Sequence, residues 1–384
     1  MKALAITDKG LEKIALMELD ELIKIKGKAQ EHAVLFDFKS YEDLFKFCYF
    51  SQSIERAILL LDEFEFKNYN DLLKKCNNVI TKSILNEWFD KNMSFRVRSQ
   101  RIGEHKFGSQ TIEKDLGEKI ILKIEKDFKY TPVVSMDSPD TTIYIYIVNN
   151  KAYLGIDLIG RDLSKRQYRM FTSAGIINAN IYYALVRLAN YTPKKRLIDI
   201  ISKSGLISIE AALYASNTSI NFFSKEFAFK KLKPFQNKNW DVFFKKLDSK
   251  KKTDKLNIIG LNPLLKSVEA SKKNAKLAGV DKIISFSKMD VEWLDTKLDK
   301  NSIDIIASKV QCPSKHTAES TVRKTYKELF YQAEFIMKKL GIMILLSEST
   351  DLLKEMITKD FKLKKQGELW AGQQKYEFVI MKRK

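Results

Sequence analysis

The spacing of apolar and polar residues differs between the two halves of this chain. In the first half, short alternating runs such as Ser94–Arg98 stand between helical periodicities such as Leu11–Ile25. From about residue 179 onward, helix-length segments alternate with short apolar strands, beginning with Asn178–Ala189 and Arg196–Ile200. Alternation of this kind predicts an α/β domain with a mostly parallel sheet covered by helices.

The same patterns divide the chain into four blocks. The first reads β-α-β-α with a further strand at its end. The second closes with two strands joined at Asn149-Asn150, which predicts a hairpin. The third is a short basic connector, and the fourth is the α/β domain. The predicted boundaries are 1–65, 66–160, 161–178 and 179–384.

Individual elements follow from the pattern as well. In the second block it predicts helices over Tyr69–Phe89 and Gln110–Lys126. In the last block the predicted strands are Arg196–Ile200, Leu256–Leu261, Ile283–Phe286, Ile303–Ala307, Gly341–Leu346 and Tyr376–Met381, and the main predicted helices are Leu265–Ala278 and Ala318–Lys339. The last of these strands is expected to be a late antiparallel insertion.

Composition narrows the class of partner. Lysine and arginine outnumber the acids 68 to 48, which gives a formal charge of +20. This excess favours a polyanion, either nucleic acid or an anionic membrane surface, over a merely solvated lysine-rich surface. No stretch approaches the roughly 18 apolar residues of a membrane span, and the N-terminus lacks a signal core, so we expect a cytoplasmic protein.

The residues that bind metals are too sparse to suggest a metal site. The three cysteines are widely spaced, and the three histidines show no spacing typical of metal ligands. We therefore expect neither a disulfide framework nor a bound metal. The residues concerned are Cys48, Cys76, Cys312, His32, His105 and His316.

Two basic segments, Phe95–Ser109 and Asp162–Arg169, combine cations with apolar anchors. The apolar residues would fix the backbone while the cations remain available to phosphates. A solvated surface without a ligand is the alternative interpretation. The candidate RNA contacts are Arg96, Arg98, Arg101, Lys106, Lys165, Arg166 and Arg169.

The order of residues in these segments resembles a known family. Phe-Arg-Val-Arg, then an arginine, Gly-Glu-His and a Phe before serine, followed by Leu-Ser-Lys-Arg-x-Tyr-Arg, is similar to archaeal THUMP-containing RNA methyltransferases. The chain looks like the branch that methylates the exocyclic amine of guanine in the transfer RNA acceptor stem. The resemblance covers nearly the full length.

That resemblance implies an architecture and partners. Residues 1–65 would form a ferredoxin-like subdomain, 66–160 a THUMP domain, and 179–384 a class I methyltransferase domain, Rossmann-like, with a mostly parallel seven-stranded sheet. The THUMP domain of the family grips the three-prime end of transfer RNA, which suits the positive charge. The α/β domain of the family holds S-adenosylmethionine.

The first cofactor motif departs from the family at one glycine. The family reads Asp-Pro-x-Cys-Gly-Ser-Gly-Thr, whereas this chain has Asp199-Ile200-Ile201-Ser202-Lys203-Ser204-Gly205-Leu206. The resemblance places Asp199, Ser204 and Gly205 at the cofactor. Lys203 replaces a glycine that lets the backbone approach the ligand, so it either pairs with the cofactor's carboxylate or fills the pocket. We favour the second interpretation.

Two further cofactor positions come from the same resemblance. Asn262 stands where the family has an acid that accepts hydrogen bonds from the ribose, and it lacks the strength of a carboxylate acceptor. Asp290 is retained and would contact the adenine amine, although an aspartate after a strand is also a common helix cap. We therefore expect S-adenosylmethionine to bind weakly.

The catalytic motif departs furthest. The family carries Asn-Pro-Pro-Tyr or Asn-Pro-Pro-Phe, in which the amide orients the target amine and the ring stacks on the base. Here Ser308, Lys309 and Gln311 occupy three of these positions, within Ser308-Lys309-Val310-Gln311. A lysine would also place a cation near a sulfonium, which is unfavourable.

Because scaffold positions match while pocket positions differ, two functions remain open. The first is a pseudo-methyltransferase that binds RNA without transferring a methyl group, and the family resemblance implies that this RNA is transfer RNA. The second is an active guanine-N2 transfer RNA methyltransferase with an atypical pocket. A protein partner or a second copy of the chain could complete the site in either case.

Overall fold

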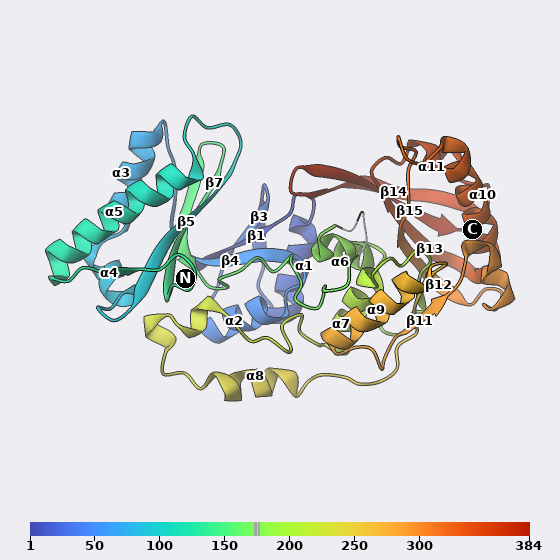
Figure 1. Ribbon diagram of the computed structural model, residues 1–384, viewed down its shortest axis with the longest axis horizontal. Helices are drawn as coiled ribbons and strands as arrows, with labels where there is room; N and C mark the ends of the chain where they lie inside the picture. The colour runs from blue at the N-terminus through green and yellow to red at the C-terminus, as the bar shows by residue number, and fades with distance from the viewer. Residues whose placement is uncertain (173–174, 176) are drawn as a thin grey trace.

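The computed structural model describes residues 1–172, 175 and 177–384 (Figure 1). The N-terminal half forms one eight-stranded sheet in the order β2-β3-β1-β4-β8-β7-β5-β6. Its elements are β1 (Lys2–Thr7), α1 (Glu12–Ile23), β2 (Gly27–Gln30), β3 (Ala33–Asp37), α2 (Tyr41–Phe50), β4 (Ile54–Glu65), α3 (Tyr69–Val79), α4 (Lys82–Trp88), β5 (Ser94–Ile102), α5 (Ser109–Phe128), β6 (Val133–Val134), β7 (Thr141–Val148) and β8 (Lys151–Asp157).

Strand β4 joins the first two blocks into one sheet. Its first part pairs with β1, and its last part pairs with β8, so the sheet has no break near residue 65. The predicted hairpin at Asn149 is confirmed: β7 and β8 pair antiparallel, and Asn149 has φ of 51°. The predicted helix over Tyr69–Phe89 is two helices, because Thr81 caps a new one by accepting from the Ile84 amide.

The C-terminal half is a seven-stranded sheet in the order β11-β10-β9-β12-β13-β15-β14. Its elements are α6 (Ala179–Leu188), β9 (Leu197–Asp199), α7 (Leu206–Ser216), η1 (Ala228–Lys230), η2 (Lys233–Phe235), α8 (Trp240–Asp248), β10 (Ile258–Asn262), α9 (Leu265–Ala278), β11 (Ser285–Lys288), η3 (Val291–Thr296), β12 (Ile303–Lys309), α10 (Glu319–Ile336), β13 (Met337–Ser347), α11 (Asp351–Glu355), β14 (Phe361–Ala371) and β15 (Gln374–Arg383).

The predicted fold class is confirmed. Strands β9 to β13 run parallel, and β15 pairs antiparallel with both β13 and β14. The sequence pattern did not reveal β14. Its first half, from Phe361 onward, carries exposed lysines at a sheet edge and therefore lacks a buried alternating face. The predicted helix to Lys339 ends at Ile336, where β13 begins directly.

One segment crosses between the halves. The residues between α7 and β10 follow the first strand of the C-terminal sheet, yet their aromatic side chains pack in the core of the N-terminal half. Phe229 and Trp240 lie with ring centroids 4.4 and 5.2 Å from that of Phe45 on α2. Figure 1 shows α8 (olive) beneath the N-terminal elements. This shared core fixes the two halves to each other.

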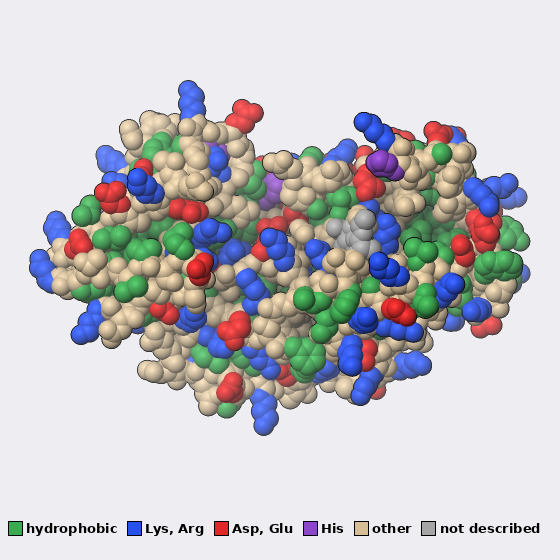
Figure 2. Space-filling model, in the orientation of Figure 1, with side chains coloured by type: hydrophobic (Ala, Val, Ile, Leu, Met, Phe, Trp, Pro, Cys, Tyr) green, Lys and Arg blue, Asp and Glu red, His purple; other side chains and the backbone are tan. Residues whose placement is uncertain are grey.

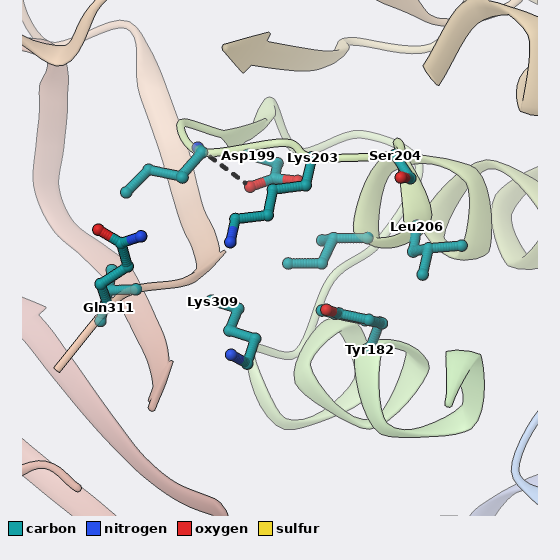
Figure 3. A pocket seen from close by; sticks show the side chains of 10 residues that line it. Tyr182, Asp199, Lys203, Ser204, Leu206, Lys309 and Gln311 are labelled. Carbon is teal, nitrogen blue, oxygen red and sulfur yellow. Dashed lines mark hydrogen bonds between the residues drawn. The ribbon is translucent and has the colours of Figure 1, made fainter. Parts of the chain in front are cut away.

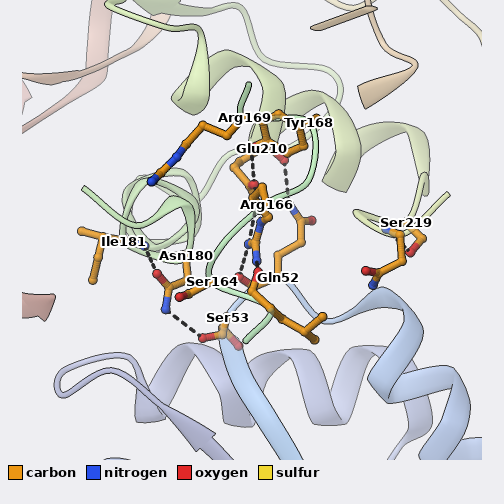
Figure 4. Close-up of polar contacts among 12 residues, drawn as sticks. Gln52, Ser53, Ser164, Arg166, Tyr168, Arg169, Asn180, Ile181, Glu210 and Ser219 are labelled. Atoms are coloured by element: carbon orange, nitrogen blue, oxygen red, sulfur yellow. Dashed lines mark hydrogen bonds and ion pairs between the residues drawn. The ribbon is translucent and has the colours of Figure 1, made fainter. Parts of the chain in front are cut away.

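A buried polar network makes a second junction between the halves (Figure 4). Glu210, in the middle of α7, accepts hydrogen bonds from Arg166 (2.8 Å), Tyr168 (2.6 Å) and Gln52 (2.6 Å). Arg166 also donates to the Gln52 carbonyl at 2.5 Å. The N-terminal half, the connector and the C-terminal domain therefore meet at one carboxylate.

This network corrects one prediction. Arg166 was expected to contact RNA, but its side chain is 1% exposed and forms an ion pair with Glu210. A guanidinium held this way satisfies a buried charge and is not available to a phosphate. Its role in this structure is to hold the two halves together.

Removing the charge of Arg166 should destabilise the protein strongly. Arg166→Met leaves the Glu210 carboxylate buried without a cation, and we expect a loss of about 3–5 kcal/mol in the free energy of unfolding. Urea denaturation measures this. The control is Lys165→Met, because Lys165 is 75% exposed and lies 3.8 Å from Asp162, a pair worth less than about 1 kcal/mol. Equal losses in the two variants would contradict the assignment.

Candidate functional site

The candidate site lies where the parallel strands of the C-terminal sheet end. Asp199 ends β9, Asn262 ends β10, and Ser308 lies near the end of β12. The loop after β9 crosses toward β10, where the Ser202 amide donates to the Leu261 carbonyl at 2.7 Å. In an open α/β sheet, this edge is where ligands bind. The Ser202–Gly205 turn therefore lies at the carboxyl end of β9, next to the end of β10 where Asn262 stands.

Gly205 is required by the geometry of this turn. Its φ is +79°, and a Cβ atom there would lie 3.0 Å from the Phe286 ring and 3.1 Å from the Ser271 side chain. Only glycine adopts this conformation without strain at such close approach. The predicted role of Gly205 as a loop glycine therefore has a structural basis independent of any ligand.

Asp199 is buried and bonded within the protein. Its Oδ1 accepts from the Ser308 hydroxyl at 2.7 Å, and Ser308 Oγ accepts from the Ile200 amide at 2.9 Å. Burial raises the pKa of Asp199 to about 6. Ser308, which replaces the catalytic asparagine of the family, thus bridges two parallel strands instead of facing a substrate.

Two lysines enter the cavity beside this loop (Figure 3). Lys203 comes from the loop after β9 and Lys309 from the end of β12. Lys309 forms an ion pair with Glu348 at 2.6 Å, and the Cys312 thiol lies 3.6 Å from the same carboxylate. Burial lowers the pKa of Lys203, and the nearby charge of Lys309 lowers it further.

The remaining cavity is small. It measures about 30 Å³ and is lined by Tyr182, Asp199, Ile201, Lys203, Ser204, Leu206, Ile207, Lys309, Val310 and Gln311. Sites for small-molecule cofactors usually measure about 300–1,000 Å³. Lys203 and Lys309 both line this cavity, and as they lie they add two ammonium groups to it, an unfavourable surrounding for a sulfonium.

The two other predicted cofactor contacts lie away from this cavity. Asn262 is 4% exposed, and its side-chain oxygen accepts from the Leu264 amide at 2.9 Å, which closes a turn after β10. Asp290 is exposed at the start of η3, and its side chain makes no capping bond. Asn262 therefore stabilises its own loop, whereas Asp290 faces solvent.

The structure brings together five of the residues that we singled out from the sequence. Asp199, Lys203, Ser204, Lys309 and Gln311 line one cavity. Gly205, Asn262, Asp290 and Ser308 do not line it, although Ser308 supports Asp199.

Two residues of the site were not predicted. Glu348 directly follows β13, the strand beside β12, so its place at the same edge was a signal that could have been used. Tyr182 lies on α6, and nothing in its sequence context singles it out.

The predicted RNA contacts fall into three groups. Arg98, Lys106 and Lys165 are exposed. Arg96, Arg101 and Arg169 are half-buried and donate to Met136 O (2.5 Å), Ser109 Oγ (3.3 Å) and Ile177 O (2.8 Å) respectively. Arg166 is buried, as described above.

Positive side chains are not confined to these segments. Figure 2 shows Lys and Arg side chains spread over both halves of the visible face. Within the described residues, no helix is long and apolar enough to cross a membrane. Among the same described residues, no three or more His, Cys, Asp or Glu side chains are grouped so that they could hold a metal ion.

The fold and the site define a class I methyltransferase-type domain that follows an N-terminal α+β module. Comparison with known families agrees: a model described as RMKL-like methyltransferase domain matches residues 166–375, and the THUMP domain model matches residues 66–157.

Individual relatives extend this agreement along the whole chain. A tRNA (guanine(6)-N2)-methyltransferase from Methanocaldococcus jannaschii is 30% identical, over 94% of this chain and 95% of that protein. A possible methylase from Clostridium difficile has a TM-score of 0.85 at 21% identity, with 100% of this chain and 97% of that one covered. The putative methyltransferase SMU.472, solved with S-adenosylhomocysteine, has a TM-score of 0.84 at 22% identity, with 99% and 97% covered. The chain belongs to the family of THUMP-containing, S-adenosylmethionine-dependent RNA methyltransferases.

The buried carboxyl at the site should make stability depend on pH. The pKa of Asp199 is about 6 in the folded protein, above the unfolded value of about 3.9, so the folded state binds the proton more tightly. The contribution of Asp199 to stability is then greatest below about pH 4 and decreases as the pH rises to about 6.

Replacing that carboxyl should remove this dependence. In Asp199→Asn the amide oxygen can still accept from Ser308, and we expect the variant to exceed the native protein by up to about 3 kcal/mol at pH 7.5. Urea denaturation at pH 4.5 and 7.5 measures both proteins. If the difference in unfolding free energy between the two proteins is the same at both pH values, Asp199 is ionised in the folded protein without an energetic cost.

Proposed function

We propose that this protein binds transfer RNA through its THUMP-containing half and does not transfer a methyl group. The observation that carries the second part is the cavity after β9 and β12, which measures about 30 Å³ and is lined by Lys203 and Lys309. Support for the first part comes from the charge of +20, the exposed cations Arg98 and Lys106, and the name of the full-length relative from M. jannaschii.

The hydrogen bonds and the ion pair within the site support the proposal that the protein does not transfer a methyl group. Lys309 is held by Glu348, Ser308 by Asp199, and Asn262 by the Leu264 amide. These three side chains each have a partner within the protein. Replacing a ribose-binding carboxylate by Asn262 also removes a charge-assisted hydrogen bond, which is worth about 1.5–3 kcal/mol.

An active transfer RNA guanine-N2-methyltransferase is the second candidate, and the comparisons favour it over the first. The relative at 30% identity over 94% of this chain carries that activity in its name. For this chain to act in the same way, Lys203 and Lys309 must leave the cavity when the cofactor arrives. Two lysine side chains are flexible enough to move, but Lys309 must then break its ion pair with Glu348.

Cofactor binding separates the two candidates. We expect calorimetry with S-adenosylmethionine to show a dissociation constant weaker than about 100 µM. Labelled methyl groups should not appear on a transfer RNA transcript. The M. jannaschii relative is the positive control. Lys203→Gly combined with Asn262→Asp should bind the cofactor more tightly than the native chain, because it restores the loop glycine and the ribose acceptor. Methyl transfer by the native protein would establish the second candidate instead.

RNA binding should depend steeply on salt. Each phosphate contact contributes about 0.7–0.9 to the slope of log affinity against log salt concentration. Replacing Arg98 and Lys106 together by Gln should therefore lower that slope by about one to two, as measured by filter binding with a transfer RNA transcript. The control replaces Lys362 and Lys364 by Gln, since both are exposed on the distant edge strand β14. Equal slopes for the two double variants would refute the assignment of this surface.

A further inference from the structure

A second pocket lies at the junction between the THUMP domain and the segment that crosses from the C-terminal domain. We refer to it as the junction pocket. It measures about 180 Å³. Its lining residues come from β5, the loop before β7, the segment after β8, and η1 with its flanks: Arg96, Asp137, Ser138, Pro139, Thr142, Ile159, Gly160, Arg161, Glu226, Phe227, Ala228 and Lys231.

Three cations of this pocket bond only to neutral groups. Arg96 donates to the Met136 carbonyl at 2.5 Å, and Lys231 donates to the Ser138 hydroxyl at 2.9 Å. Arg161 donates to the Glu226 carbonyl and the Asn221 side chain. None of the three forms an ion pair with a described carboxylate, although ion pairs are common elsewhere on this protein. Their charges are therefore not neutralised by a direct ion pair.

Burying these arginines costs free energy, and a bound anion would reduce that cost. Arg96 Nε is buried and has no hydrogen-bond partner within the described residues. Burial lowers the pKa of both Arg96 and Arg161, and the nearby Arg98 lowers that of Arg96 further. A buried donor without a partner costs about 1–3 kcal/mol, which is why such groups tend to mark binding sites.

The two acids of the pocket do not neutralise it. Asp137 is exposed, and Glu226 is 79% exposed and lies 3.9 Å from Lys230, which is outside the pocket. The pocket therefore presents three cations against two carboxylates that face solvent. A planar guanidinium binds a phosphate through two parallel hydrogen bonds, and a lysine adds a third donor.

We propose that the junction pocket binds one backbone phosphate of the RNA. This inference rests on the proposed RNA binding and adds a site to it. The volume is about six times that of a water molecule in the liquid, enough for a phosphate group. Arg96 also lines the larger groove between β5 and α5, so the pocket opens beside that groove. The pocket contains residues of both halves. A phosphate bound there would therefore contact both halves only when they keep this relative position.

The test is a double-mutant cycle with Arg96→Gln and Lys231→Gln, in which binding of a transfer RNA transcript is measured across salt concentrations. Each single variant should weaken binding about tenfold or more and lower the salt slope by about one. If both cations hold the same phosphate, the double variant should lose little more than either single variant. The control Lys245→Gln makes the same charge change as Lys231→Gln on exposed α8. Additive losses, or losses equal to that of the control, would overturn the proposal.

A separate measurement does not depend on RNA. At constant ionic strength, inorganic phosphate should raise the melting temperature of the native protein relative to chloride, and this rise should be absent in the double variant. If the native protein binds no transfer RNA but phosphate still stabilises it through these residues, the proposed function fails while the anion site stands. If phosphate and chloride act alike on the native protein, the junction pocket is not a phosphate site.

Discussion

The arrangement of this protein depends on one buried carboxylate. Glu210 lies fully buried in α7 and is bonded by Arg166, Tyr168 and Gln52, which belong to the connector and to the N-terminal half. A charge in this position costs several kcal/mol unless its partners surround it, so the three segments are held in one arrangement. The aromatic core that Phe45 shares with the crossing segment reinforces the same geometry. As a result, the cations of the THUMP domain keep a fixed position relative to the edge of the C-terminal sheet.

Much of the fold could be predicted from the sequence because it depends on local periodicity. Strands such as β12 are buried on both faces and read as apolar runs, so their order and the α/β class followed directly. The failures have a common cause. Strand β14 lies at an edge with lysines exposed, and the residues between α7 and β10 pack against a different half of the molecule. Arg166 looked like an RNA contact for the same reason, since a cation in a basic segment reveals nothing about a carboxylate 44 residues away. The spacing of apolar residues indicates which face of an element is buried, but not which other element packs against that face.

The position of the site could be predicted from the sequence, but the directions of the side chains in it could not. Parallel strands bring their carboxyl ends to one edge, so the strand pattern and the family resemblance together assigned Asp199, Asn262 and Ser308 to that edge. The direction of the Lys203 and Lys309 side chains could not be predicted, because it depends on partners from neighbouring strands. Lys309 turns toward a glutamate at the end of β13, and Ser308 bonds across to β9. The sequence favoured Lys203 as a side chain that fills the pocket over one that pairs with a cofactor's carboxylate, and Lys203 lines this cavity.

The same physical criterion gives opposite answers at the two cavities. A preformed ligand site holds polar groups whose partners are missing until the ligand arrives, since burying them unpaired is otherwise costly. Beside the loop after β9, Asp199 and Lys309 already have partners in the protein, and little volume remains. At the junction pocket, Arg96 and Arg161 donate to neutral groups and form no direct ion pair with a described carboxylate, and the volume is about six times larger. By this criterion the junction pocket is a candidate for a preformed anion site, because Arg96 Nε is buried there without a partner among the described residues.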